Sequence, residues 1–132
     1  MMHSWKNPAV LNKLLKELPP PEAIAPFPKA EDRRAWEERI LPETRSLWIG
    51  LAERLADYAW PVQRVDYYRD YWLHGSLTKD MNLRFERRSA LGILAMAECI
   101  EGKGRFLDQV INGIYALCEQ TSWVPPGHQT QL

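Results

Sequence analysis

The sequence predicts an all-α protein, and three observations carry this prediction. Apolar residues recur at helical spacing along residues 43–58 and again along residues 106–118. Between Ala90 and Ile100, nine of eleven residues are apolar, so a helix there must be covered on nearly every side. Glycines and prolines separate these stretches, as they do between packed helices joined by short turns.

The first third of the chain predicts two short helices joined by a connector. Asn7 and Pro8 suit an N-cap and a first helical residue, and the prolines from Pro19 end the helix that they start. Residues 19–28 are proline-rich and predict a semi-rigid connector, although a peptide-like arm for a partner has the same composition. A charged helix is expected over residues 31–41.

The middle of the chain predicts one clear amphipathic helix and one aromatic helix. Residues 43–58 carry three leucines at a spacing of four, with charged residues on the opposite face. Residues 62–73 are rich in Tyr and Trp at helical spacing, although aromatic residues suit strands as well. We expect residues 75–82 to form a polar loop and the helix to resume at Leu83.

The last two helices are expected to form an antiparallel hairpin. Gly102 and its neighbours end the first helix, and Phe106 begins the second. The apolar stripe of the second helix predicts that Leu94, Ile111 and Ile114 are buried between the two helices.

Composition limits the classes of partner and the compartment. The 132 residues and 45% hydrophobic content predict a single helical domain over residues 1–132. Seventeen basic and seventeen acidic residues cancel, so no global field favours nucleic acid or an anionic membrane. No signal peptide or membrane span is recognised, and a cytoplasmic location is the expectation. Cys99 and Cys118 are expected to be buried, free thiols.

One long stretch resembles a known family. Residues 104–128, GRFLDQVINGIYALCEQTSWVPPGH, together with Arg87, Ala97 and Glu98, resemble the N-terminal part of heparinase II/III-like proteins, which are bacterial polysaccharide-lyase relatives. The resemblance covers the second half of the chain well and the first half loosely. It implies an α/α toroid of paired helices followed by a β-sandwich, and uronic-acid polysaccharides as substrates. The chain would then be an N-terminal arc of such a toroid.

The resemblance also implies a reaction and a limit on it. β-Elimination at a uronic acid needs a group that neutralises the carboxylate, a base for the C5 proton and an acid for the leaving oxygen. In the family these roles fall largely to Asn, His and Tyr residues of later helices and the sandwich. The candidates in this chain are His128 as base and Tyr71 as phenolic acid, and an ordinary loop histidine is the simpler explanation for His128. We therefore expect a fragment that is inactive by itself.

Aromatic and basic residues give candidate substrate contacts. Tyr67, Tyr68 and Trp72 present faces on which sugar rings stack, and Trp123 lies in the family-like segment. Arg69 beside them suits a carboxylate or sulfate group. Packing of aromatic residues between helices is the commoner explanation of the same pattern.

Two further charged features have alternative explanations. Arg84, Arg87 and Arg88 share one helical face, which suits either an anion clamp or, as we favour, a solvated arginine face. Glu98 interrupts the apolar run, so it lies at a helix edge, pairs with a base such as Arg105 or Lys103, or has a raised pKa. We favour a structural ion pair.

Metals and cofactors are not expected. The three histidines are scattered, and neither metal-binding spacing nor a glycine-rich phosphate loop occurs. The expected partners are an acidic polysaccharide or oligosaccharide, and either a second copy or the missing C-terminal part of a toroid. The alternative function is a non-enzymatic helical interaction or oligomerisation module.

Overall fold

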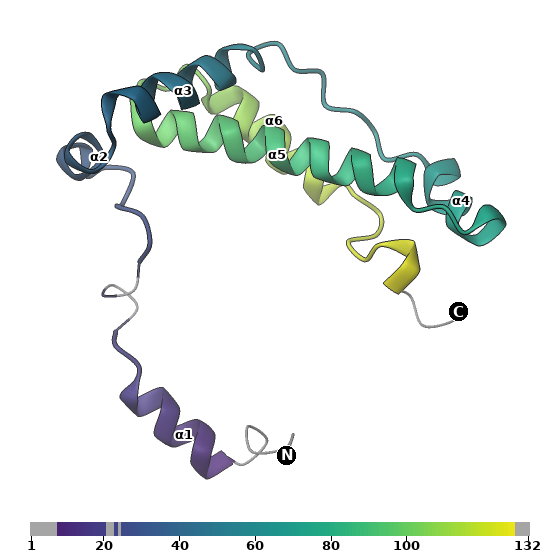
Figure 1. Ribbon diagram of the computed structural model, residues 1–132, viewed down its shortest axis with the longest axis horizontal. Coiled ribbons are helices and arrows are strands. Elements are labelled where there is room, and N and C mark those ends of the chain that lie inside the picture. Colours follow the sequence, from purple (N-terminus) through teal and green to yellow (C-terminus); the bar gives the residue numbers. More distant parts are fainter. Residues whose placement is uncertain (1–7, 21–22, 24, 129–132) are drawn as a thin grey trace.

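The computed structural model describes residues 8–20, 23 and 25–128, and this part of the chain is helical with no strand (Figure 1). The prediction of an all-α protein is confirmed. The elements are α1 (Pro8–Glu17), α2 (Arg33–Arg39), α3 (Pro42–Glu53), α4 (Val65–His74), α5 (Thr78–Glu101), α6 (Leu107–Cys118) and the 3₁₀ turn η3 (Pro126–His128). The proposed N-cap, Asn7, lies outside the described residues.

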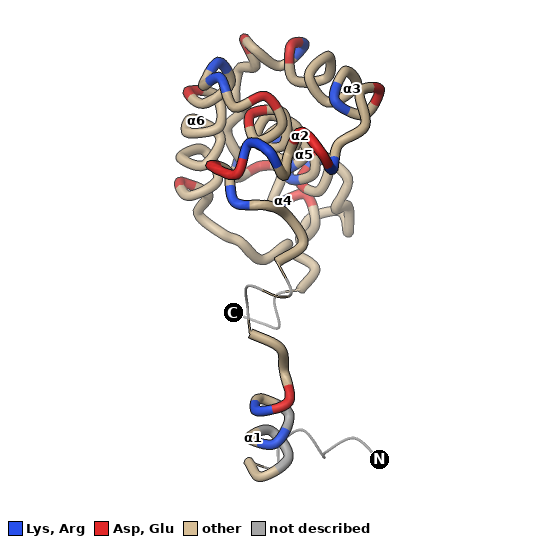
Figure 2. The backbone as a smooth tube through the Cα atoms, turned by 90° about the vertical axis from the view of Figure 1, so that its left-hand side faces the viewer, with Lys and Arg blue, Asp and Glu red and all other residues tan. Residues whose placement is uncertain are grey.

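Helix α5 is the centre of the fold. It has 24 residues and is contacted by α2, α3, α4 and α6. Helices α3 and α6 both lie along its C-terminal part, α2 lies near its C-terminal end and α4 near its N-terminal end (Figure 1). Helix α1 stands apart from these helices, and acidic and basic residues are interspersed over the packed part (Figure 2). Among the described residues, no helix is long and apolar enough to cross a bilayer.

Helix α5 begins five residues earlier than the sequence pattern indicated. The expected loop over residues 75–82 is wrong for its second half, because α5 starts at Thr78. Asp80 lies in the first turn, where a carboxylate suits the helix N-terminus, and it accepts a hydrogen bond from Arg84 one turn later. Helix α3 is correspondingly shorter than expected and ends at Glu53, and the aromatic stretch forms α4 as a helix.

The turn between α5 and α6 is held by Glu98. Gly102 and Gly104 have φ values of 67° and 79°, in the left-handed region that favours glycine. The Glu98 carboxylate accepts hydrogen bonds from the backbone N–H groups of Gly104 (2.6 Å) and Phe106 (3.0 Å). The favoured ion pair for Glu98 is therefore wrong, and its partners are backbone donors that the helix start leaves unpaired.

The hydrophobic core lies between α3, α5 and the start of α6. Its buried members are Ala52, Leu94, Ala97 and Phe106. Leu94 is fully buried as predicted.

The predicted burial of Ile111 and Ile114 is wrong, because these side chains are 43% and 47% exposed. Helix α6 turns Gly113 inward, where the Trp60 ring packs so closely that a Cβ atom would lie 2.5 Å from it. Leu107, Ile111 and Ile114 consequently face outward, whereas Val110 packs against the core. Cys118, one turn after Ile114, is exposed rather than buried, and Cys99 is half-buried; both thiols are free.

Candidate functional site

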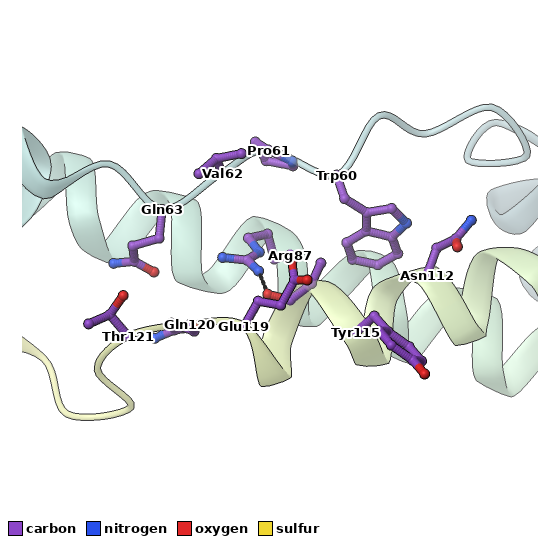
Figure 3. A pocket seen from close by; sticks show the side chains of 11 residues that line it. Trp60, Pro61, Val62, Gln63, Arg87, Asn112, Tyr115, Glu119, Gln120 and Thr121 are labelled. Carbon is purple, nitrogen blue, oxygen red and sulfur yellow. Dashed lines mark hydrogen bonds between the residues drawn. The ribbon is translucent and has the colours of Figure 1, made fainter.

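Two adjoining pockets lie between the chain segment that precedes α4 and the segment that follows α6. The first, of about 460 Å³, is lined by residues 60–63 on one side and by α6 and residues 119–121 on the other (Figure 3). The second, of about 430 Å³, is lined by residues 63–65, Tyr68, Arg84 and residues 121–122. Gln63 and Thr121 line both pockets. We call the two together the polar groove.

Two buried arginines of α5 form the base of the polar groove. Arg84 is 1% exposed, and its Nε donates to Asp80 Oδ2 (2.6 Å) while its Nη1 donates to the Ser122 carbonyl (3.0 Å). Arg87 is 2% exposed and donates to the Ala116 carbonyl, the bond drawn at the centre of Figure 3. Both arginines therefore bind carbonyls at or beyond the end of α6, where a helix leaves its carbonyl groups unpaired.

The favoured solvated arginine face is wrong for these two residues. Arg88 alone of the three is exposed. Arg84 and Arg87 are buried because α6 and the following segment cover this face of α5, and their guanidinium groups satisfy carbonyls there. Burial lowers the pKa of Arg87, and the neighbouring positive charge of Arg84 adds to that effect.

A further set of hydrogen bonds links the segment before α4 to this base. Gln63 Nε2 donates to Asp80 Oδ1, so the Asp80 carboxylate bridges Gln63 and Arg84. Gln120 is buried and its side-chain amide donates to the Ser122 carbonyl. Sequence reasoning missed Gln63, Asp80 and Gln120. The spacing of four between Asp80 and Arg84 was the one local signal for part of this network.

Buried polar atoms without a hydrogen-bond partner gather in the polar groove. Among the described residues these atoms are Gln63 Oε1, Tyr68 OH, Arg84 Nη2 and Arg87 Nε, and all four residues line it. A buried polar group without a partner costs about 1–3 kcal/mol. The polar groove is therefore the place in the described structure where a polar molecule has most to gain by binding.

The predicted aromatic residues of α4 lie in different environments. Tyr68 enters the polar groove, whereas Tyr67 lies beneath the Arg64 guanidinium, 5.3 Å from its ring centroid. Trp72 is exposed and meets the half-buried Tyr71 edge to face, with ring centroids 5.4 Å apart. Arg69 is exposed on the same helix.

The two catalytic candidates lie on elements that touch. Helix α4 packs against η3, the turn that ends in His128. A methyl group placed on Gly127 would lie 3.6 Å from Tyr71 Cε2, so the Tyr71 ring packs directly on this turn. His128 itself is exposed, as is Trp123, while Pro126 is buried. The structure thus brings Tyr71 to the residue beside His128 and leaves Trp123 at the surface.

Tyr58 is the most strongly perturbed phenol described near the polar groove. Burial, then the hydrogen bond that it donates to Glu86 (2.7 Å), raises its pKa to about 12. Its ring meets Trp60, which lines the first pocket, edge to face at 5.0 Å. A phenol with this pKa stays protonated at neutral pH and acts as a donor, not as a base.

The polar groove is equipped for hydrogen bonding to a ligand. The described residues contain no group of three or more His, Cys, Asp or Glu side chains arranged to hold a metal ion. Comparison with protein-family models and with curated proteins finds no match to this chain.

Proposed function

We propose that this chain is the N-terminal toroid segment of a heparinase II/III-like polysaccharide lyase, a class that cleaves uronic-acid-containing polysaccharides by β-elimination. One observation carries the proposal. Residues 104–128, which carry the family resemblance, are the residues that Arg84 and Arg87 bind, and they form one wall of the polar groove. The family-like segment is therefore also the segment that builds the candidate site.

The packing of α6 supports a toroid. Leu107, Ile111 and Ile114 form an exposed apolar stripe on α6. Exposed apolar surface of this kind marks a face that binds another element. In an α/α toroid, the next helical pair covers that face.

Substrate contacts are proposed around α4. Trp72 and Trp123 are exposed aromatic faces for sugar rings, and Arg69 is an exposed cation for a carboxylate or sulfate group. Tyr67 on α4 is half-buried and is a further aromatic candidate. Tyr68 contributes its hydroxyl inside the polar groove.

Catalysis by this chain alone is not expected. His128 and Tyr71 are the base and acid candidates, and the family resemblance implies that the remaining catalytic groups come from later helices and the sandwich. Incubation with heparin, chondroitin, hyaluronan or alginate should give no near-ultraviolet absorbance from an unsaturated uronate. If absorbance does appear, loss of that activity in His128→Ala or Tyr71→Phe would assign the site, and no loss in either would remove both residues from it.

Binding tests the proposal directly. Oligosaccharides of the same four polymers, titrated into ¹⁵N-labelled protein, should shift backbone signals of α4 and of residues 122–128. Arg69→Gln should weaken binding, since it removes an exposed charge without disturbing packing, and Arg39→Gln on α2 is the matched control. Absence of binding by all four polymers, or equal effects of the two variants, would overturn the proposal.

A non-enzymatic interaction module is the second candidate, and the apolar stripe of α6 is the observation that favours it. Self-association through this face predicts a concentration-dependent dimer by light scattering. Ile114→Lys should abolish such a dimer, whereas Arg39→Gln should leave it intact. A monomer at all concentrations would exclude association between copies through the stripe.

A further inference from the structure

The second pocket of the polar groove has a donor and acceptor pattern that distinguishes among ligands. Three of its lining residues carry a buried polar atom without a partner: Arg84 Nη2, Tyr68 OH and Gln63 Oε1. Arg84 is almost completely buried, so its position is fixed by the fold. The Nη2 group is a donor, the amide oxygen is an acceptor and the phenol serves as either.

The orientation of the Gln63 amide follows from its neighbour. Its Nε2 faces Asp80 Oδ1, and an ionised carboxylate only accepts hydrogen bonds. The nitrogen must therefore point at Asp80, and the oxygen of this pocket-lining residue is left without a donor. A ligand that satisfies this oxygen must bring an O–H or N–H group.

The charges disfavour an anion at this position. Arg84 already pairs with Asp80 at 2.6 Å, and both side chains are fully buried. Arg64 at the rim pairs with Asp66 at 2.9 Å. An added carboxylate or sulfate in the second pocket would meet Arg84, which Asp80 already neutralises, and would leave the Gln63 oxygen without a donor. Arg87, which donates to a carbonyl, lines the first pocket and not the second.

We infer that this pocket binds the hydroxyl groups of a neutral sugar ring, not the acidic group of a uronate. A hydroxyl both donates and accepts, so neighbouring ring hydroxyls can accept from Arg84 Nη2, donate to Gln63 Oε1 and pair with Tyr68 OH. The side chains of Val65 and Tyr68 supply apolar wall for the ring face. The volume of about 430 Å³ lies within the range of roughly 300–1,000 Å³ typical of small-molecule pockets.

This inference rests on the proposed function, since it names the subsite that would hold a neutral residue of the same saccharide. Acidic contacts are left to Arg69 and the exposed aromatic residues outside the pocket. We therefore expect a neutral probe to bind in the second pocket and an acidic probe to bind outside it, near Arg69.

The test uses methyl β-D-glucopyranoside as the neutral probe and acetate as the anion, each titrated into the ¹⁵N-labelled full chain. The glucoside should give saturable shifts, with a millimolar dissociation constant, at the side-chain signals of Arg84 Nε and the Gln63 amide. Acetate should not compete. Tyr68→Phe keeps the ring and removes one hydrogen bond, so it should weaken glucoside binding about two- to tenfold. Tyr115→Phe, at an exposed tyrosine of α6 that does not line this pocket, should not weaken it.

Each outcome is decisive for the inference. No saturable shift would mean that water satisfies these atoms and would overturn it, as would competition by acetate or equal effects of the two tyrosine variants. Glucoside binding without any binding of the four acidic polymers would sustain this inference and remove the proposed function. Binding of acidic polymers to α4 without glucoside binding would do the reverse.

Discussion

The pair formed by Asp80 and Arg84 gives the sharpest test of the fold, because it is fully buried and it holds the C-terminal segment. Asp80→Asn keeps the shape of the side chain and removes its charge. Asp80 accepts from Gln63 Nε2 through one oxygen and from Arg84 Nε through the other, and Asn replaces one of these oxygens by an NH2 donor, so one of the two hydrogen bonds is lost as it stands. Arg84 is also left as a buried, uncompensated charge.

Breaking a buried pair in this way costs about 3–5 kcal/mol. Proteins have free energies of unfolding of about 5–15 kcal/mol, so Asp80→Asn should remove a large fraction of the stability. The corresponding fall in melting temperature is roughly 10–20 °C for a chain of this size. Urea unfolding followed by circular dichroism measures the loss.

Two further variants test whether the loss of stability comes from the burial of the pair and not from the loss of any carboxylate. Asp66→Asn breaks the exposed pair with Arg64 and should leave the unfolding midpoint unchanged. The double variant Asp80→Leu/Arg84→Met replaces both charges by apolar groups and should recover much of the loss. The Ser122 carbonyl keeps the Gln120 amide as a donor, whereas Gln63 Nε2 loses its acceptor. A loss below about 1 kcal/mol in Asp80→Asn, or no recovery in the double variant, would refute the buried pair.

Three other predictions concern stability, and each states whether the free energy of unfolding rises or falls. Leu94→Ala should lower the free energy of unfolding by about 2–5 kcal/mol, since Leu94 is fully buried, and urea unfolding measures it. Gly113→Ala should lower the free energy of unfolding by about 1–3 kcal/mol, because its methyl group would meet the Trp60 ring at 2.5 Å. Gly92→Ala meets nothing within 4 Å and should raise the free energy of unfolding by about 0.5–1 kcal/mol. Changes of melting temperature with the same sign in both variants would contradict this packing. Burial and a neighbouring carboxylate raise the pKa of Tyr58 from 10.0 to about 12, so its contribution to stability is fully present below pH 10 and is lost as the pH rises toward 12. Tyr58→Phe should therefore show a shallower alkaline decline of the unfolding midpoint.

The existence of the helices was predictable, and their boundaries were less so. Periodicity over residues 106–118 and the glycines from Gly102 located α6 and the end of α5 to within a residue or two. The start of α5 was missed because Thr78, Lys79 and Asp80 are polar residues that suit a loop as well as a first helical turn. The Asp80 contact with Gln63, seventeen residues earlier, is not visible in any local pattern.

The direction in which a face points was not predictable from periodicity. The pattern of α6 identifies its apolar stripe correctly, but burial depends on which neighbour approaches and how closely. Gly113 offers the closest approach to the Trp60 ring, so α6 packs on its glycine side, and Ile111 and Ile114 face outward. An exposed apolar stripe is the consequence, and it is the feature that another helical pair or a second copy would cover.

The candidate site was likewise predictable only in those parts that depend on local sequence. Local spacing was enough to select α4 as an aromatic helix, because neighbours three and four apart share a face. The polar groove draws on residues 60–65, α4, α5 and residues 112–122, which only the tertiary fold brings together. Arg84 and Arg87 illustrate the difference, since arginines at this spacing suit a solvated face until α6 ends beside them. There Arg87 donates to the Ala116 carbonyl in the last turn of α6, and Arg84 joins Gln120 in donating to the Ser122 carbonyl, so both guanidinium groups are buried with partners. The donor and acceptor atoms that remain without partners indicate what the pocket can bind.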